Sequence, residues 1–147
     1  MNIFALQGKA KQGKTKTLIF LIEELDKNGV NKEFCQKTGP EDYCAKFEHK
    51  GKKIGITTHG DDRSVLENDF NLLGDDCDIY VCAVRTKGET VEFVEEKSKG
   101  DTLVFFGKAT YDVPKSSEPQ DKLKSKQEKI NEYQAQLILC EIEEFLK

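Results

Sequence analysis

Apolar runs and segments of helical periodicity alternate along this chain, and the alternation constrains its fold more than any other feature. The runs predict strands over residues 2–7, 33–37, 43–50, 52–58, 78–85 and 102–106. Apolar residues at helical spacing predict helices over residues 15–28, 63–73, 89–99 and 126–147. This order predicts an α/β fold: a three-layer sandwich around a mainly parallel sheet of about five strands, with one antiparallel hairpin strand.

The chain has 147 residues, which is the length of a single domain. Residues 112–126 are polar and contain Pro114 and Pro119, so we expect an exposed connection that leads into the last helix. That helix could cover the sheet or bind a protein partner. The width of its apolar face favours the covering role.

Residues 8–15, between the first predicted strand and the first predicted helix, carry a motif with a chemical purpose. They read Gly8-Lys9-Ala10-Lys11-Gln12-Gly13-Lys14-Thr15 and match GxxxxGK followed by Ser or Thr. Glycine permits the backbone angles with which a loop surrounds a phosphate with N–H groups. Lys14 can then reach the terminal phosphates and Thr15 can hold Mg²⁺, while the following helix directs its positive end at the anion. We call residues 8–15 the 8–15 loop.

On this motif and its context the chain resembles the P-loop NTPase superfamily over most of its length. The resemblance implies Mg²⁺-dependent binding of a nucleoside triphosphate and reaction at its terminal phosphate. The residues implied in nucleotide binding are Gly8, Lys9, Ala10, Lys11, Gln12, Gly13, Lys14, Thr15 and Lys16. Lys9 occupies the place of a second lysine in the deviant loop of ParA/MinD-like ATPases, which implies an extra phosphate contact. Ala10 and Lys11 replace the glycines of that group.

The order of loop, helix, hairpin and following turn also resembles small GTPases. Thr57-Thr58-His59-Gly60 stands where those proteins have DxxG, with threonine in place of the aspartate. Phe106-Gly107-Lys108-Ala109 replaces the base-reading NKxD. We therefore infer the architecture without guanine specificity and take ATP as the first candidate, with GTP as the second.

The residues that follow the hairpin are expected beside the 8–15 loop, because ligands of open α/β sheets bind beyond the carboxyl ends of strands. Phosphoryl transfer needs a carboxylate near Mg²⁺, and Asp61 and Asp62 are the nearest in the sequence. We expect one of them, with Asp61 taken first, to share the metal with Thr15. The alternative role for either aspartate is to cap the 63–73 helix.

Both arginines of the chain, Arg63 and Arg85, are predicted at the same edge of the sheet. A guanidinium there can stabilise charge that develops on the γ-phosphate, and a surface ion pair is the alternative for each. Thr58 or His59 could orient water or an acceptor hydroxyl. The catalytic group expected from the sequence is thus Lys14, Asp61, Arg63 and Arg85.

Composition narrows the classes of partner. The chain has 23 Lys and Arg and 27 Asp and Glu side chains, which give a net charge of −4. A dedicated nucleic-acid binder carries an excess of basic residues, which this chain lacks. It has neither a run of about 18 apolar residues nor a leader pattern, so we expect a cytoplasmic protein without a membrane partner. The five cysteines lack CxxC spacing and are expected to be structural thiols. The partners expected are a nucleoside triphosphate and either another protein or a second copy.

Three functions remain open from the sequence. The leading hypothesis is slow hydrolysis by a switch or by the nucleotide-dependent part of an assembly. The second is a small-molecule or nucleotide kinase, for which only residues 39–42 and 112–126 could form a lid, and neither has an arginine-rich pattern. The third is a regulatory module that binds a nucleotide without turnover.

Overall fold

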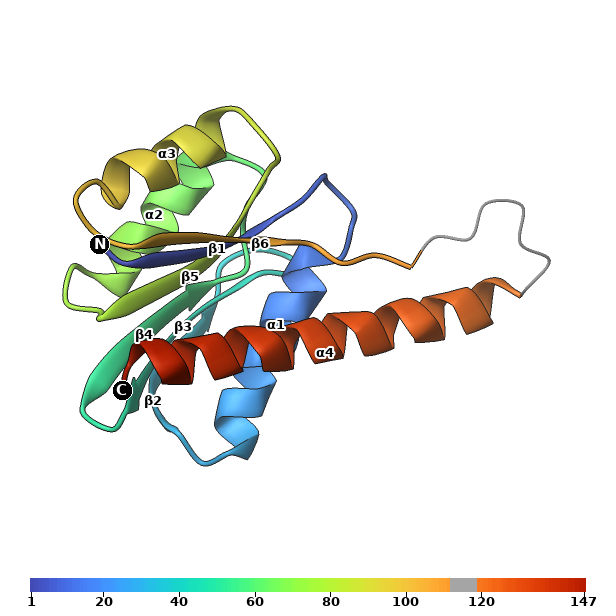
Figure 1. Cartoon of the computed structure of the whole chain (residues 1–147), viewed down its shortest axis with the longest axis horizontal. Helices are drawn as coiled ribbons and strands as arrows, with labels where there is room; N and C mark the ends of the chain where they lie inside the picture. Colours follow the sequence, from blue (N-terminus) through green and yellow to red (C-terminus); the bar gives the residue numbers. More distant parts are fainter. Residues whose placement is uncertain (112–118) are drawn as a thin grey trace.

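The computed structural model describes residues 1–111 and 119–147, which form six strands and four helices (Figure 1). The strands are β1 (Ile3–Gln7), β2 (Asn31–Lys37), β3 (Tyr43–His49), β4 (Lys52–Thr57), β5 (Ile79–Val84) and β6 (Leu103–Gly107). The helices are α1 (Lys14–Lys27), α2 (Arg63–Leu73), α3 (Glu89–Lys97) and α4 (Gln120–Phe145). The alternation expected from the sequence is therefore present.

The strands form one mixed sheet in the order β2-β3-β4-β5-β1-β6. β3 pairs antiparallel with both of its neighbours, and the remaining strand pairs are parallel. Five strands consequently run in one direction, and β3 begins at the edge where they end. This edge, the carboxyl rim, is where ligands bind in sheets of this kind.

Side chains of the central strands alternate between two layers of helices. In β1, Phe4 and Leu6 pack toward α1 and α4, whereas Ile3 and Ala5 pack toward α2 and α3. All six residues of β5 are buried, as expected for a strand covered on both faces. Figure 1 shows α2 and α3 together on one side of the sheet, with α1 and α4 crossing on the other. The architecture is that of three layers.

Two expectations about the strands need correction. The sheet has six strands rather than about five, because residues 31–37 pair with β3 along their whole length. Residues 102–106 were expected to form a buried strand, but β6, at residues 103–107, is only partly buried. Within the part of the chain that the structure describes, β6 pairs with β1 alone and lies at an edge of the sheet, so its other edge has no neighbouring strand there.

The last helix begins earlier than the sequence predicted. Residues 120–126, expected in an exposed connection, are the first turns of α4, which follows directly on Pro119. Proline is compatible with the start of a helix, because the backbone nitrogen there makes no hydrogen bond within the helix. The remainder of the predicted connection, residues 112–118, lies outside the described residues.

One face of α4 covers the sheet, as the sequence favoured. Ala135, Ile138 and Ile142 belong to the same apolar cluster as Phe4 of β1. The helix has 26 residues, about 39 Å at 1.5 Å per residue, and its amino-terminal half extends past the body in Figure 1. No described helix, α4 included, is both long and apolar enough to cross a membrane.

Candidate functional site

The 8–15 loop connects β1 to α1 at the carboxyl rim. The Gly8 amide donates to the Val84 carbonyl of β5 at 3.1 Å, which anchors the start of the loop. Gly13, the residue before α1, has a φ of +93°, in the left-handed region that glycine adopts at low cost. Among the described residues no side chain caps α1, so the first N–H groups of this helix face the loop without a side-chain acceptor. Such a helix end is a general site for anions.

The Lys14 side chain folds back over the loop and is only 5% exposed. Its Nζ atom donates to the Gly8 carbonyl at 2.6 Å and lies 3.3 Å from Asp61 Oδ1. Burial lowers the pKa of this ammonium, and the neighbouring Asp61 carboxylate opposes that shift. Asp61 itself is 55% exposed, so an anion from solvent can take its place beside Lys14.

Thr15 faces a second carboxylate, Asp42, which the sequence analysis did not assign to the site. Thr15 Oγ1 lies 3.4 Å from Asp42 Oδ1 and 3.3 Å from the Thr58 carbonyl oxygen. The Thr58 hydroxyl donates to the same Asp42 oxygen at 2.7 Å. Asp42 reaches the rim because it precedes the antiparallel β3. A signal was available in the sequence, since an acidic residue at the start of the predicted antiparallel strand must lie at this edge.

His59 links Asp42 to the helix behind it. Its Nε2 lies 3.0 Å from Asp42 Oδ2, and its Nδ1 lies 2.8 Å from Asp69 Oδ2. Asp69 is a buried residue of α2 and also accepts the Thr57 hydroxyl at 2.5 Å. Polar contacts therefore run without a break from Thr15 in the loop to Asp69 in α2. Sequence reasoning missed Asp69, whose position inside a helical pattern gives no sign of this role.

Gly60 allows Asp61 to reach the loop, although β5 separates β4 from β1 in the sheet. A Cβ atom at Gly60 would lie 2.5 Å from backbone and side-chain atoms of Ala83 in β5. The chain after β4 thus passes directly over the end of β5, at a distance that only glycine permits. Arg85 supports this crossing through a 3.3 Å bond from its Nε to the Asp61 carbonyl.

The other predicted residues divide into those at the loop and those away from it. Arg85 lies at the loop, with Nε 3.7 Å from the Asp61 carboxylate. Asp62 instead caps α2, because its side chain accepts from the Ser64 and Val65 amides. The hydrogen bond from the Ser64 hydroxyl, together with those from the two amides, lowers the pKa of Asp62. Arg63 is not brought to the loop. It forms ion pairs with Glu67 at 2.9 Å and with Glu96 of α3 at 2.7 Å, which is the surface role weighed for it above.

A cleft of about 950 Å³ opens over the 8–15 loop. Asp42 and Tyr43 line one side, and Tyr111 and the amino-terminal half of α4 line another. Asn131 of α4 lies so close to the loop that a Cβ atom at Gly13 would be 3.0 Å from its amide. Of the loop lysines, Lys11 and Lys14 line the cleft together with the following Lys16, whereas Lys9 and Ala10 are exposed at the tip. The cleft has the volume of a site for a small organic ligand.

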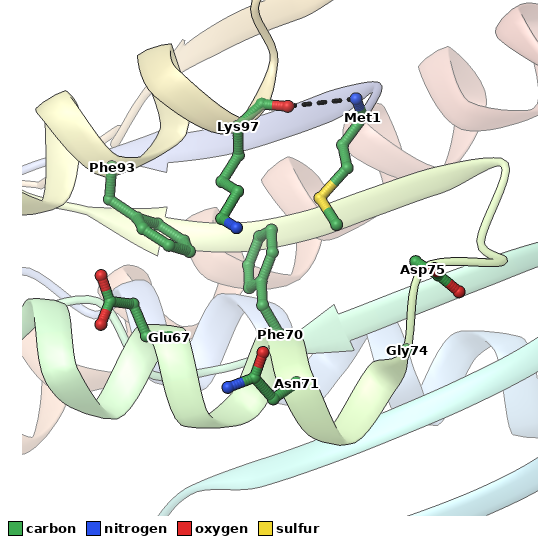
Figure 2. Close-up of a pocket in the computed structure, with 8 residues that line it drawn as sticks. All are labelled: Met1, Glu67, Phe70, Asn71, Gly74, Asp75, Phe93 and Lys97. Atoms are coloured by element: carbon green, nitrogen blue, oxygen red, sulfur yellow. Dashed lines mark hydrogen bonds between the residues drawn. The ribbon is translucent and has the colours of Figure 1, made fainter.

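A second cavity, of about 520 Å³, lies at the opposite rim (Figure 2). Phe70 and Phe93 meet edge to face at its floor, with their ring centroids 5.1 Å apart. The terminal amino group of Met1 donates to the Lys97 carbonyl beside it. Because Met1 precedes β1 and the 8–15 loop follows it, this cavity is separate from the cleft.

The Thr15 hydroxyl, the Asp42 carboxylate and the Thr58 carbonyl are hard oxygen groups of the kind that binds Mg²⁺. Among residues 1–111 and 119–147 no group of three or more His, Cys, Asp and Glu side chains is arranged as a metal site. A magnesium ion shared with phosphates does not require such a group, since one or two protein oxygens complete its coordination. Comparisons of the chain with known protein families, with curated proteins and with solved structures find no match.

Proposed function

We propose that this protein binds a nucleoside triphosphate together with Mg²⁺ and hydrolyses it slowly. The observation that carries the proposal is the position of Lys14. Its ammonium is held over the 8–15 loop by the Gly8 carbonyl and Asp61, at the open end of α1 and inside the larger cleft. A lysine that converges in this way with an uncapped helix end favours the binding of phosphate.

Phosphate binding requires Lys14 to exchange Asp61 for the ligand. An exposed ion pair contributes about 0.2–1 kcal/mol, and Asp61 is more than half exposed. A charge-assisted hydrogen bond from a buried ammonium to phosphate contributes about 1.5–3 kcal/mol. The ligand therefore displaces Asp61, while the bond to the Gly8 carbonyl can keep Lys14 over the loop.

Mg²⁺ fits the chemistry of the groups beside Thr15. The Asp42 carboxylate and the Thr58 carbonyl lie 3.4 Å and 3.3 Å from the Thr15 hydroxyl, and all three are hard oxygen ligands. When bound, the ion would neutralise charge on the β- and γ-phosphates. Thr15 and Asp42 would hold it. The Thr58 hydroxyl and His59 fix the Asp42 carboxylate, so we assign these two as positioning residues.

Asp61 and Arg85 are the groups left to act on the terminal phosphate. Once Asp61 has released Lys14, its carboxylate lies beside the γ-phosphate and can orient the attacking water. Arg85 holds the Asp61 backbone and can stabilise charge on the phosphate oxygens. The nucleoside would occupy the part of the cleft that Tyr111 and α4 line together. ATP is the first candidate, because residues 106–109 lack the guanine-reading sequence.

The proposal is tested with the four common nucleoside triphosphates, with Mg²⁺ or with EDTA, by thermal unfolding and by phosphate release. A nucleotide at 100 times its Kd should stabilise the fold by roughly 2.7 kcal/mol. We expect Lys14→Ala to abolish this stabilisation and the phosphate release. The free protein should remain folded but lose about 0.5–3 kcal/mol of unfolding free energy, because the nearly buried Lys14 side chain also bonds to the Gly8 carbonyl. Lys99→Ala, an exposed lysine beyond α3, is the matched control and should behave like the parent.

The outcomes separate the proposed activity from its alternatives. Phosphate release without an acceptor supports the proposal, whereas transfer to an added acceptor identifies a kinase. Stabilisation without turnover identifies a binding module. Equal nucleotide affinity of Lys14→Ala and the parent would refute the phosphate site itself.

A further inference from the structure

We propose that α4 pairs antiparallel with α4 of a second copy of this chain. The face of the helix that points away from the sheet is apolar at its centre, where Tyr133 is 66% exposed and Leu137 is 52% exposed. Ala135, Ile138 and Ile142 are buried on the opposite face, so these two large side chains take no part in covering the sheet. This inference does not depend on the proposed nucleotide activity.

The outward residues follow the spacing of a helix that packs against another helix. Residues 126, 130, 133, 137, 140 and 144 succeed one another at intervals of four and three. This is the spacing of the core positions in a coiled coil, and it keeps one stripe on one face. We call these six residues the outer stripe. Its four central members are Ile130, Tyr133, Leu137 and Cys140, all apolar.

The outer stripe is complementary to itself when one helix is reversed. Its spacing is symmetric about residue 135, so an antiparallel copy places Tyr133 opposite Leu137 and Ile130 opposite Cys140. At the two ends Lys126, which also donates to the Tyr111 hydroxyl, lies opposite Glu144, which also pairs with Lys147. With a twofold axis beside residue 135, each residue of the outer stripe in one copy faces its counterpart in the other copy. An isologous dimer requires this symmetry.

Charge selects the antiparallel arrangement over the parallel one. On the outward half of α4, three lysines precede Ile130 and three glutamates follow Cys140: Lys122, Lys126 and Lys129, then Glu141, Glu143 and Glu144. An antiparallel pair brings each lysine cluster beside a glutamate cluster, whereas a parallel pair aligns like charges. Lys129 and Glu143 flank the outer stripe on the same side and would pair between copies.

The shape of the molecule permits this arrangement. Each body lies behind its own α4, on the side opposite the outer stripe, so the two bodies would lie on opposite sides of the helix pair. The amino-terminal half of α4, which extends past the body, would lie against the carboxyl-terminal half of the second helix (Figure 1). Contact would extend along the helix, about 39 Å, rather than at one point.

The first experiment measures the mass of the whole protein in solution over a range of concentrations. We expect about twice the chain mass of 16.7 kDa, and a return to 16.7 kDa for the double variant Tyr133→Lys with Leu137→Lys. Leu72→Lys, which charges an exposed leucine of α2, is the matched control and should leave the dimer intact. A monomeric parent at every concentration, or a dimer that survives the double variant, overturns the proposal.

The second experiment tests the direction of pairing. Lys129→Glu should weaken the dimer at least tenfold at low salt, and addition of Glu143→Lys to the same chain should restore it. In a background with Cys35→Ser, Ile130→Cys should form a disulfide with Cys140 of the second copy under a mild thiol oxidant, whereas the background alone should not. A parallel pair would instead cross-link the background itself, because Cys140 would lie beside Cys140, and Glu143→Lys would then fail to compensate for Lys129→Glu. Thermal unfolding of each variant checks that the fold is retained.

Discussion

At the scale of single residues, two aspartates approach the 8–15 loop from different elements and contact different groups. Asp42 comes from the turn before β3 and lies beside the Thr15 hydroxyl, and Asp61 comes from the crossing after β4 and lies beside the Lys14 ammonium. In the proposed function, Asp42 and Thr15 hold the metal, whereas Lys14 leaves Asp61 to bind the phosphate. The two carboxylates should therefore respond differently to the same substitution.

We expect Asp42→Asn to reduce Mg²⁺-dependent nucleotide affinity by about tenfold or more, because the amide removes an anionic ligand of the ion. Asp61→Asn should leave affinity unchanged or raise it, since the phosphate no longer competes for Lys14, and should slow phosphate release. Mg²⁺ titrations at a fixed nucleotide concentration measure the first effect, and single-turnover phosphate release measures the second.

The contrast between the two variants is the control. Equal loss of Mg²⁺ dependence in both would assign the metal to Asp61 as well as to Asp42. Retention of full Mg²⁺ dependence in Asp42→Asn would remove Asp42 from the metal site.

At the scale of elements, the crossing of the chain over β5 is the step on which the site depends. Gly60→Ala would place a methyl group 2.5 Å from Ala83, and the overpacking should cost about 1–3 kcal/mol of unfolding free energy. The displaced segment should also carry Asp61 away from Lys14 and lower turnover. Urea unfolding measures the stability, and phosphate release measures the displacement.

Gly107→Ala is the comparison for this prediction, because a Cβ atom there meets no atom within 4 Å. It should change stability by no more than about 0.5 kcal/mol. Equal effects of the two substitutions would mean that the approach of Gly60 to β5 does not constrain the fold.

The positions of the helices and strands along the chain were predictable from the sequence, because the spacing of apolar residues reflects which side chains are buried. The full burial of β5 and the end of α2 at Gly74 were both visible as patterns. Strand order was not, because every strand of a parallel sheet presents a similar apolar run and no residue marks its neighbour. The insertion of β5 between β1 and β4, and with it the need for Gly60, therefore appeared only in the structure.

The candidate site was predictable in part for the same reason. The 8–15 loop is contiguous in the sequence, so its residues could be identified from spacing alone. Asp42, His59 and Asp69 come from three separate segments and meet only through the direction of β3. Arg63 was expected at the rim with Arg85, yet its place in the first turn of α2 directs it toward Glu96 of α3.

At the scale of the whole molecule, buried thiols and a buried phenol link stability to pH. Burial is the largest cause that raises the pKa of Cys44 to about 12, of Cys77 to about 11 and of Tyr80 to about 12. Thiols and phenols ordinarily titrate near 8.5 and 10 in an unfolded chain. Because the folded values are higher, their contribution to stability is complete below about pH 8.5 and is lost as the pH rises toward 12.

We expect the urea midpoint to fall above about pH 9. Cys82→Ala should make this fall shallower, since burial raises the pKa of the Cys82 thiol as well, whereas Cys140→Ala at an exposed position should not. Lys108, whose pKa burial lowers to about 8, acts in the opposite direction between pH 8 and 10.5. The difference between Cys82→Ala and Cys140→Ala therefore measures the contribution of the buried thiol. If the urea midpoint fell equally steeply with pH in both variants, burial of Cys82 would not be the cause.

The long helix α4 connects the cleft to a part of the apolar core far from it. Near the middle of α4, Asn131 lies against Gly13 in the cleft, and at the carboxyl-terminal end Phe145 packs on Phe4 with ring centroids 5.6 Å apart. A continuous helix tilts as a rod over a few turns, so a ligand that pushes Asn131 outward must also move Phe145 or bend the backbone between them. The free energy of that tilt would change the affinity of the cleft for its ligand. It would change the affinity of the outer face of α4 for a partner by the same factor, because coupling between two sites is reciprocal.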